Sequence, residues 1–208
     1  WMDIINAAWF NKTVFWIKNP GNSDEAFQVI DIDQPGNMET AIAADINNDG
    51  QLDVLPNITS NPAWYSYKPD ASAQNGVIWT KHELPREGGG HGNGAGDVNG
   101  DGKTDIVVRN GWLEQTADSW AWHPEYDLGD RPSIPILVHD VDDDGDSDII
   151  WGAAHGYGVF WMEQSGSADE GQWNKHVVDD SWSQAHYLLL ADVNNDGSKE
   201  LITGKRFR

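Results

Sequence analysis

An acidic segment of nine residues recurs four times in this chain of 208 residues, and it constrains the fold more than any other feature. Each copy has Asp first, Asp or Asn third, Asp fifth, Gly sixth and a carboxylate ninth. The copies occupy residues 45–53, 97–105, 140–148 and 192–200, so their starts are 52, 43 and 52 residues apart. A repeat of roughly 40–50 residues indicates a fold in which one small supersecondary unit is used several times.

The residues between the acidic segments are typical of short strands. Apolar runs follow the segments at 54–55, 106–108, 149–150 and 201–202, and we expect aromatic strands next, at 14–17, 63–67, 120–122 and 159–162. Outer strands such as 77–84 and 173–178 follow, and inner strands such as 41–44 and 188–191 lead into the next segment. No stretch has the period near 3.6 of a helix. Four strands per repeat predict an all-β β-propeller with four-stranded antiparallel blades.

The acidic segments have the ligand pattern of a calcium loop, because alternating oxygen side chains on a tight turn suit this hard cation. An EF-hand is excluded, since it needs a Glu at position 12 and flanking helices, whereas Pro56, Val108, Trp151 and Thr203 stand there between strands. Solvated turns without metal remain the alternative. The expected ligands of structural calcium are Asp45, Asn47, Asp49, Gln51, Asp53, Asp97, Asn99, Asp101, Lys103, Asp105, Asp140, Asp142, Asp144, Asp146, Asp148, Asp192, Asn194, Asp196, Ser198 and Glu200.

Composition narrows the class of protein further. With 34 acidic and 13 basic residues the formal net charge is −21, which argues against a nucleic-acid partner because phosphate binding needs clustered cations. Apolar runs are too short for a membrane-spanning helix, and the absence of Cys excludes disulfides and cysteine-based zinc sites. Extracellular modules bind calcium weakly, and such sites suit the secreted or periplasmic location that we expect.

The acidic segment followed by a β-branched strand resembles the repeat of FG-GAP/VCBS β-propellers, and the resemblance extends over the whole chain. Members of that family include adhesion heads, lectin-like modules and carbohydrate-active enzymes. Further motifs are similar to the propeller of aldos-2-ulose dehydratase and its bacterial relatives: GGHGNG at 89–94, GWLEQ at 111–115, WGAAHGY at 151–157, DSWSQAH at 180–186 and GKRF at 204–207.

This resemblance implies a seven-bladed ring, histidines that bind zinc near its mouth, and the dehydration of a keto-sugar such as 1,5-anhydrofructose. Asp3-Ile4-Ile5 matches Asp148-Ile149-Ile150, so we expect Asp3 to be the last ligand of a further acidic segment. We therefore expect residues 1–208 to be an interior slice of one propeller domain, roughly four blades, with both ends cutting through a repeat and further blades and domains in a longer parent chain.

Equivalent positions in successive blades lie around one axis, so residues at a fixed offset from the acidic segments should meet at the mouth of the channel. Six residues before each segment stand Glu39, His91, Ile134 and His186, and seven residues past the segment ends stand Phe10, Ser60, Trp112, His155 and Phe207. We expect His91, His155 and His186 to bind zinc with an open fourth position. Ordinary hydrogen-bonding histidines are the alternative.

Other side chains are candidates for handling a sugar at this mouth. Glu39 or Tyr157 would carry the acid–base step, and Lys205 or Arg206 would hold a hydroxyl, carbonyl or carboxylate. Trp112 and Trp182 would stack on a sugar ring, with a place in the core as the alternative.

We expect no metal-binding role for three histidines outside the mouth. His82 and His176 recur at matching positions, and we expect both to be structural. We expect His123 to lie in a turn.

The function that these patterns favour is a secreted, calcium-stabilised propeller that acts on or binds a carbohydrate, as a metal-dependent keto-sugar dehydratase, which is a carbon–oxygen lyase. The alternative is a non-catalytic lectin-like or adhesion propeller, which needs calcium but no transition metal at its mouth.

Overall fold

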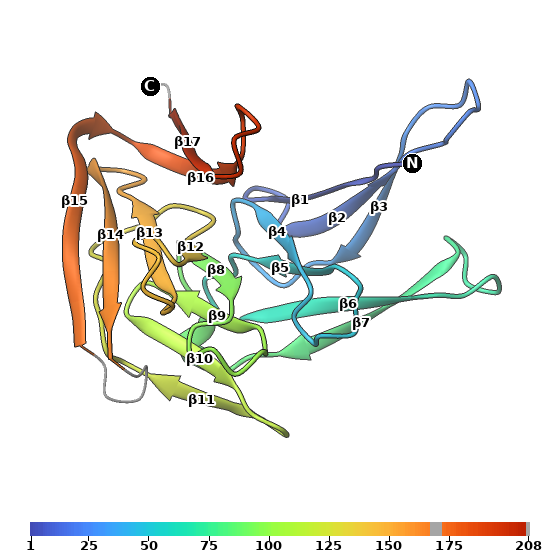
Figure 1. Cartoon of the computed structure of the whole chain (residues 1–208). Coiled ribbons are helices and arrows are strands. Elements are labelled where there is room, and N and C mark those ends of the chain that lie inside the picture. The colour runs from blue at the N-terminus through green and yellow to red at the C-terminus, as the bar shows by residue number, and fades with distance from the viewer. Residues whose placement is uncertain (167–171, 207–208) are drawn as a thin grey trace. The chain divides into compact units, whose positions relative to one another are not determined.

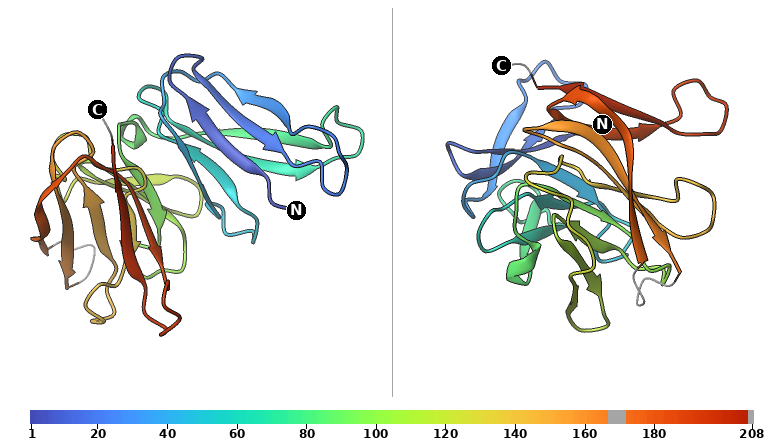
Figure 2. Two further views of the ribbon diagram at one scale, coloured as in Figure 1. Left: turned by 90° about the horizontal axis from the view of Figure 1, so that it is seen from above. Right: turned by 90° about the vertical axis from the view of Figure 1, so that its left-hand side faces the viewer.

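The computed structural model describes residues 1–166 and 172–206, and within them every sheet is antiparallel (Figure 1). The chain divides into two compact units, residues 1–89 and residues 90–208. The views in Figure 2 show each sheet as a meander of strands that are neighbours in the sequence.

The first unit holds two sheets. One has three strands in the order β1-β2-β3, and the other has four in the order β4-β5-β6-β7. Their bounds are Ile4–Ala8, Thr13–Lys18 and Gln28–Asp33 for β1 to β3, and Ala41–Ala44, Asp53–Pro56, Ala63–Pro69 and Val77–Glu83 for β4 to β7. A 3₁₀ turn at Arg86–Gly88 follows. Val14, Met38, Val54, Ile58 and Tyr65 form the core of this unit, which is hydrophobic and almost closed to solvent.

The second unit holds two four-stranded sheets and one two-stranded sheet, β16-β17. Strands β8 to β11 are Asn93–Gly96, Asp105–Val108, Gly111–Gln115 and Trp120–His123. Strands β12 to β15 are Leu137–His139, Asp148–Gly152, Tyr157–Ser165 and Gln172–Ser183, and β16 and β17 are Ala185–Ala191 and Glu200–Lys205. Trp112, Ile136, Ile149, Trp151 and Met162 are central to its hydrophobic core.

The acidic segments all occupy the same place in the fold, between the first and second strands of a sheet. Strand β4 ends at Ala44 and β5 begins at Asp53, and the later copies are bracketed in the same way by β8 and β9, β12 and β13, and β16 and β17. The four-stranded antiparallel sheets are consistent with propeller blades. Among the described residues no sheet closes into a ring.

One expected strand is in the wrong place. Residues 120–122, expected as the aromatic third strand of their blade, belong to the outer strand β11, and the third strand is β10. The reason is a short connection: only Arg109 and Asn110 separate β9 from β10, so the aromatic strand comes earlier than in the other repeats.

Glycines allow the innermost strands β8 and β12 to pack unusually close together, as they lie in Figure 1. A Cβ atom added to Gly94 would fall 1.8 Å from the carbonyl oxygen of Ile136, and one added to Gly96 would fall 2.6 Å from Val138 Cβ. The Ile136 N–H donates to the Asn93 carbonyl across the same interface at 2.8 Å. This close approach holds the sheet of β8 to β11 against the sheet of β12 to β15.

Candidate metal centre

Three histidines from different sheets converge in the second unit. His91 lies two residues before β8, His155 lies in the turn between β13 and β14, and His186 is the second residue of β16. Each is partly buried, and one ring nitrogen of each lies within 4.8 Å of the others. The three ring centroids are 4.9 to 5.4 Å apart. The residues that repeat counting placed at the mouth therefore do meet.

The backbone fixes the proton of His91. Its Nδ1 lies 2.9 Å from the carbonyl oxygen of Pro132, and because a carbonyl only accepts, Nδ1 must be the donor. In a neutral imidazole the other nitrogen then carries a lone pair. That nitrogen, Nε2, lies 3.1 Å from Nε2 of His155.

The lone pair of His155 is fixed from the other side. Nη1 of Arg206 lies 3.3 Å from His155 Nε2, and a guanidinium only donates, so this nitrogen accepts. Burial, together with the neighbouring His91, Arg206, His186 and Arg131, lowers the pKa of His155 to about 4. His155 is therefore neutral at neutral pH.

This arrangement fits a transition-metal ion. Nε2 of His91 and Nε2 of His155 lie 3.1 Å apart, close enough for one ion to be bound by both. Three imidazoles are a donor set that suits Zn²⁺. His91, His155 and His186 would hold such an ion.

One short segment of backbone, the strap of residues 131–135, contacts the surroundings of all three histidines. The Pro132 carbonyl accepts from His91, and the Ile134 N–H donates to the His186 carbonyl at 3.0 Å. The Arg131 carbonyl accepts from the Ala154 N–H at 3.1 Å, beside His155. The strap therefore links the three blades at this point.

Ser133 anchors the strap. It is fully buried, and its hydroxyl donates to the Pro135 carbonyl at 3.0 Å and accepts from the Gly152 N–H at 3.0 Å. Its own N–H donates to the Gly152 carbonyl at 2.8 Å. Neither Ser133 nor the strap was singled out from the sequence, because no motif marks them.

The candidate acid–base and cationic residues are placed as follows. Tyr157 begins β14, two residues after His155, and its side chain is 70% exposed. Arg206 contacts His155, whereas Lys205 is exposed and pairs with Ala185 at the edge strand β17. Glu39 belongs to the first unit, where its N–H donates to Asn57 Oδ1 at 2.8 Å. Phe207 lies outside the described residues.

The two candidate tryptophans differ sharply in exposure. Trp112 is fully buried, its indole Nε1–H donates to Glu125 at 2.7 Å, and its ring packs in the core. This burial argues against the sugar-stacking role that the sequence suggested for Trp112 and agrees with the core alternative. Trp182 is 41% exposed on β15, so its ring is open to a ligand.

The four acidic loops share one conformation. The first Asp accepts backbone N–H bonds from the fifth and sixth residues, as when Asp45 accepts from Asp49 at 3.0 Å and from Gly50 at 2.8 Å. The fourth and sixth residues have φ between +57° and +98° in every copy. These residues are Asn48, Gly50, Gly100, Gly102, Asp143, Gly145, Asn195 and Gly197. Asn, Asp and Gly are the residues that tolerate this conformation, which explains why they recur there.

The ninth residue of each loop turns inward. Asp53, Asp105 and Asp148 are almost completely buried, and burial raises the pKa of each carboxyl to about 6 although backbone N–H groups bond to them. The fourth loop has Glu200 there instead, and its carboxylate accepts from the Val193 N–H at 2.8 Å. A nearby cation would favour the ionised form of these carboxyls.

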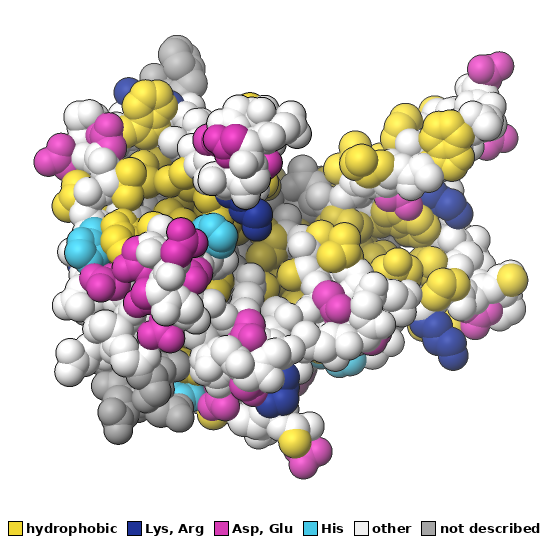
Figure 3. Space-filling model, viewed as in Figure 1, with side chains coloured by type: hydrophobic (Ala, Val, Ile, Leu, Met, Phe, Trp, Pro, Cys, Tyr) yellow, Lys and Arg dark blue, Asp and Glu magenta, His cyan; other side chains and the backbone are white. Residues whose placement is uncertain are grey.

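Loop 140–148 is the most acidic copy. One carboxylate oxygen from each of Asp140, Asp142 and Asp148 lies within 4.8 Å of the others. Desolvation and the charge of Asp144 raise the pKa of Asp142. Figure 3 shows such acidic side chains gathered in groups on the face seen there. These oxygens are the hard ligands that calcium takes, and its binding stays a prediction.

A stack of histidine on tryptophan recurs in three sheets. The pairs Trp64–His82, Trp112–His123 and Trp161–His176 are directly opposite each other in neighbouring strands, with ring centroids 3.9, 4.2 and 4.5 Å apart. This agrees with the structural role expected of His82 and His176.

His123 belongs to the same set, although a turn was expected. It ends β11, its Nδ1 lies 3.0 Å from Glu125, and its Nε2 lies 2.9 Å from Glu114. Burial lowers the pKa of His123, but the two carboxylates outweigh that effect and the net shift is upward.

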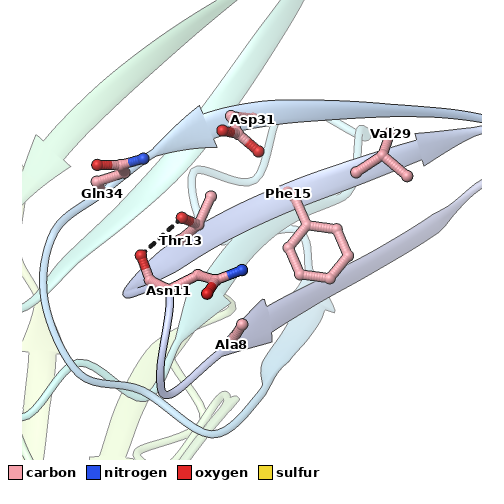
Figure 4. A pocket seen from close by; sticks show the side chains of 7 residues that line it. All are labelled: Ala8, Asn11, Thr13, Phe15, Val29, Asp31 and Gln34. Carbon is pink, nitrogen blue, oxygen red and sulfur yellow. Dashed lines mark hydrogen bonds between the residues drawn. The ribbon is translucent and has the colours of Figure 1, made fainter.

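The first unit has a separate open pocket of about 570 Å³ on the sheet β1-β2-β3 (Figure 4). Phe15 from β2 lies beside Asp31 from β3, and Asn11 and Gln34 line the rim. An aromatic ring flanked by short polar side chains is a lining suited to a small polar ligand.

Comparison with known proteins supports the repeat family. Residues 89–116 match the FG-GAP repeat, a stretch that contains His91, the second acidic loop and β10. No curated protein and no solved structure matches the chain. The repeat suggests a β-propeller-like interaction domain.

No helix in the described part of the chain is long and apolar enough to cross a membrane.

Proposed function

We propose that this chain is part of a calcium-stabilised propeller that acts on a carbohydrate at a metal centre held by His91, His155 and His186. The observation that supports this proposal most strongly is the convergence of ring nitrogens from all three histidines within 4.8 Å, with Nε2 of His91 only 3.1 Å from Nε2 of His155.

The reaction that we propose is the loss of water from a keto-sugar. A proton leaves the carbon beside the carbonyl and hydroxide leaves the next carbon, so that the sugar becomes an unsaturated carbonyl compound and one water is released. A zinc-type ion bound at this centre would supply a Lewis acid for the sugar carbonyl.

The chain's own residues would do the remaining work. Tyr157 is exposed beside His155 and would move the proton, with Glu39 as the other acid–base candidate. The exposed ring of Trp182 would stack on the sugar. The four acidic loops would bind structural calcium, and the weak calcium affinity of such extracellular modules favours a secreted or periplasmic protein.

Turnover of 1,5-anhydrofructose by the zinc-loaded protein tests this function. We expect an unsaturated carbonyl product that absorbs in the near ultraviolet, and we expect the His155→Ala variant to lose at least about a hundredfold in rate. His82→Ala is the matched control, since His82 stacks on Trp64 and binds Ser66 in the first unit. Equal rates for His155→Ala and His82→Ala would refute the metal-dependent reaction.

A second candidate function is a non-catalytic interaction module, which the FG-GAP repeat and the pocket beside Phe15 favour. A glycan-binding screen separates the two functions. If Phe15→Ala abolishes glycan binding while His155→Ala does not, the protein is a lectin-like module and the histidines are not its working site.

A further inference from the structure

Arg206 holds a defined position at the end of β17. Its backbone N–H donates to the Gln184 carbonyl at 3.0 Å, and its side chain is partly buried. From there Nη1 reaches Nε2 of His155 at 3.3 Å. The guanidinium therefore occupies the nitrogen that the proposed metal centre needs.

The contact creates a competition. A neutral imidazole offers one lone pair in the plane of its ring, at the unprotonated nitrogen, so an Arg N–H and a metal ion cannot both use His155 Nε2. Metal binding would cost Arg206 this acceptor. A partly buried donor without an acceptor is unfavourable, so the guanidinium would need a new partner.

The charges at the site indicate which partner this would be. A second guanidinium, Arg131, is close enough to influence His155, and its carbonyl is part of the strap beside that residue. Arg131 is already paired with Asp130 at 3.8 Å, so Arg206, which contacts His155, is the better placed of the two guanidinium groups for an anionic ligand. Guanidinium groups bind carboxylates through two parallel hydrogen bonds. These charge-assisted bonds are stronger than the hydrogen bonds that a neutral sugar hydroxyl can form with the same group.

We propose that Arg206 is an exchange residue, which competes with the metal for His155 and, once displaced, binds the carboxylate of an acidic sugar. This inference rests on the proposed metal centre and deepens it, because it narrows the preferred keto-sugar to one that carries a carboxylate. It gives Arg206 two opposite effects, one on the metal and one on the ligand.

Opposite effects can be measured on one variant. Zinc affinity is determined by competition with a chromophoric chelator, and affinity of the zinc-loaded protein for D-glucuronate and D-glucose is determined by calorimetry. Arg206→Ala should bind zinc on the order of tenfold more tightly and glucuronate on the order of tenfold more weakly, as expected for one charge-assisted hydrogen bond. Glucose binding should not change.

Two further variants sharpen the result. Arg206→Lys keeps the charge but lacks the planar fork, so it should recover part of the glucuronate affinity. Arg109→Ala is the matched control, since this half-exposed arginine of the same unit pairs with Asp127 and Asp130 and contacts no histidine that the structure describes. Both affinities of Arg109→Ala should equal those of the wild type.

The outcomes separate the exchange from the centre itself. If Arg206→Ala binds zinc as tightly as the wild type, or more weakly, the exchange is refuted but the metal centre is not. Equal wild-type affinity for glucuronate and glucose overturns the acidic ligand. A wild type that binds no zinc overturns the metal centre and the exchange together.

Discussion

His91 Nε2 lies 3.1 Å from His155 Nε2, although 64 positions separate the two residues in the chain. His91 comes just before the innermost strand of one sheet, and His155 comes after the second strand of the next. Packing of one sheet against the next therefore creates the centre, and small residues between the sheets set its dimensions.

The tight approach of β8 and β12 makes Gly94 a sensitive position. We expect Gly94→Ala to lower the free energy of unfolding by about 3 kcal/mol, because the new methyl group would overlap the Ile136 carbonyl. Zinc affinity should fall as well, since the blades must move apart. Denaturant unfolding measures the first effect, with Gly204→Ala as the control because no atom lies within 4 Å of its added Cβ. Equal stability of the two variants would show that β8 and β12 can move apart at no measurable cost, which would contradict this prediction.

Removal of the Ser133 hydroxyl should loosen the strap. Ser133→Ala removes the hydrogen bonds that Ser133 Oγ makes with the Gly152 N–H and the Pro135 carbonyl. The loss should lower the free energy of unfolding by about 1–3 kcal/mol. Because the strap orients the histidines, zinc affinity should fall roughly tenfold or more, as for other outer-shell changes. The cobalt-substituted protein provides a readout of geometry, since its visible spectrum reports the ligand field. An unchanged spectrum in Ser133→Ala would limit Ser133 to a structural role.

The buried ninth carboxyl links calcium binding to pH. Because the pKa of Asp105 is about 6 in the folded chain and 3.8 ordinarily, the folded state holds this proton more tightly. With a chelator present, stability should therefore fall as the pH rises from about 4 through 6. Calcium requires the ionised carboxyl, so the stability that it adds should be largest above pH 6 and should shrink on acidification.

Thermal unfolding with chelator and with saturating calcium, at about pH 5 and pH 7, tests this linkage. Asp105→Asn serves as the comparison, because the amide cannot titrate and the contribution of loop 97–105 should vanish. A calcium effect of equal size at both pH values would contradict the assignment of these carboxyls as ligands.

His123 should give the opposite dependence on pH. Its two carboxylate partners hold its pKa above the usual 6.5, so the stability that it contributes is complete below pH 6.5 and is lost as the pH rises through the folded value. His123→Gln should cost about 1–3 kcal/mol at pH 6 and less at pH 8.

His82 supplies the internal contrast for this experiment. Burial lowers its pKa, and its partner is the neutral Ser66 hydroxyl, so its contribution should fall on acidification through pH 6.5. Stability curves of His82→Gln and His123→Gln that respond to pH in the same direction would contradict one of the two assignments, namely the one whose predicted direction is not observed.

The sequence was sufficient where the physics is local and repeated. The acidic loops could be located because Gly, Asn or Asp is needed at two left-handed positions in every copy, and Asp at the first position accepts the N–H groups of the turn. The strand predicted at 41–44 is confirmed with the same bounds as β4, because it lies directly before such a loop. The meeting of His91 and His186 with His155 was predicted from two offsets, six residues before a segment and seven residues after one, since equivalent positions in successive blades lie around one axis.

The sequence was misleading where connections change length. The two-residue link before Gly111 moves Trp112 into the core strand β10, so its offset no longer marks a mouth residue. The pairing of Trp112 with His123 could have been found, since Glu114 follows Trp112 at the same interval as Glu163 follows Trp161. The role of Ser133 could not be found in this way, because its hydroxyl is bonded to backbone groups of Pro135 and Gly152, which no sequence motif marks.

Elemental analysis of the protein, purified without chelators or affinity-column metals, tests the metal centre most directly. We expect one zinc or similar ion per chain in addition to calcium, and loss of that ion alone in His91→Ala and His186→Ala. His176→Ala should keep it, because His176 pairs with Trp161 and Glu163 instead. A wild-type chain with calcium but no transition metal, or with metal content that none of the three variants changes, would contradict the centre.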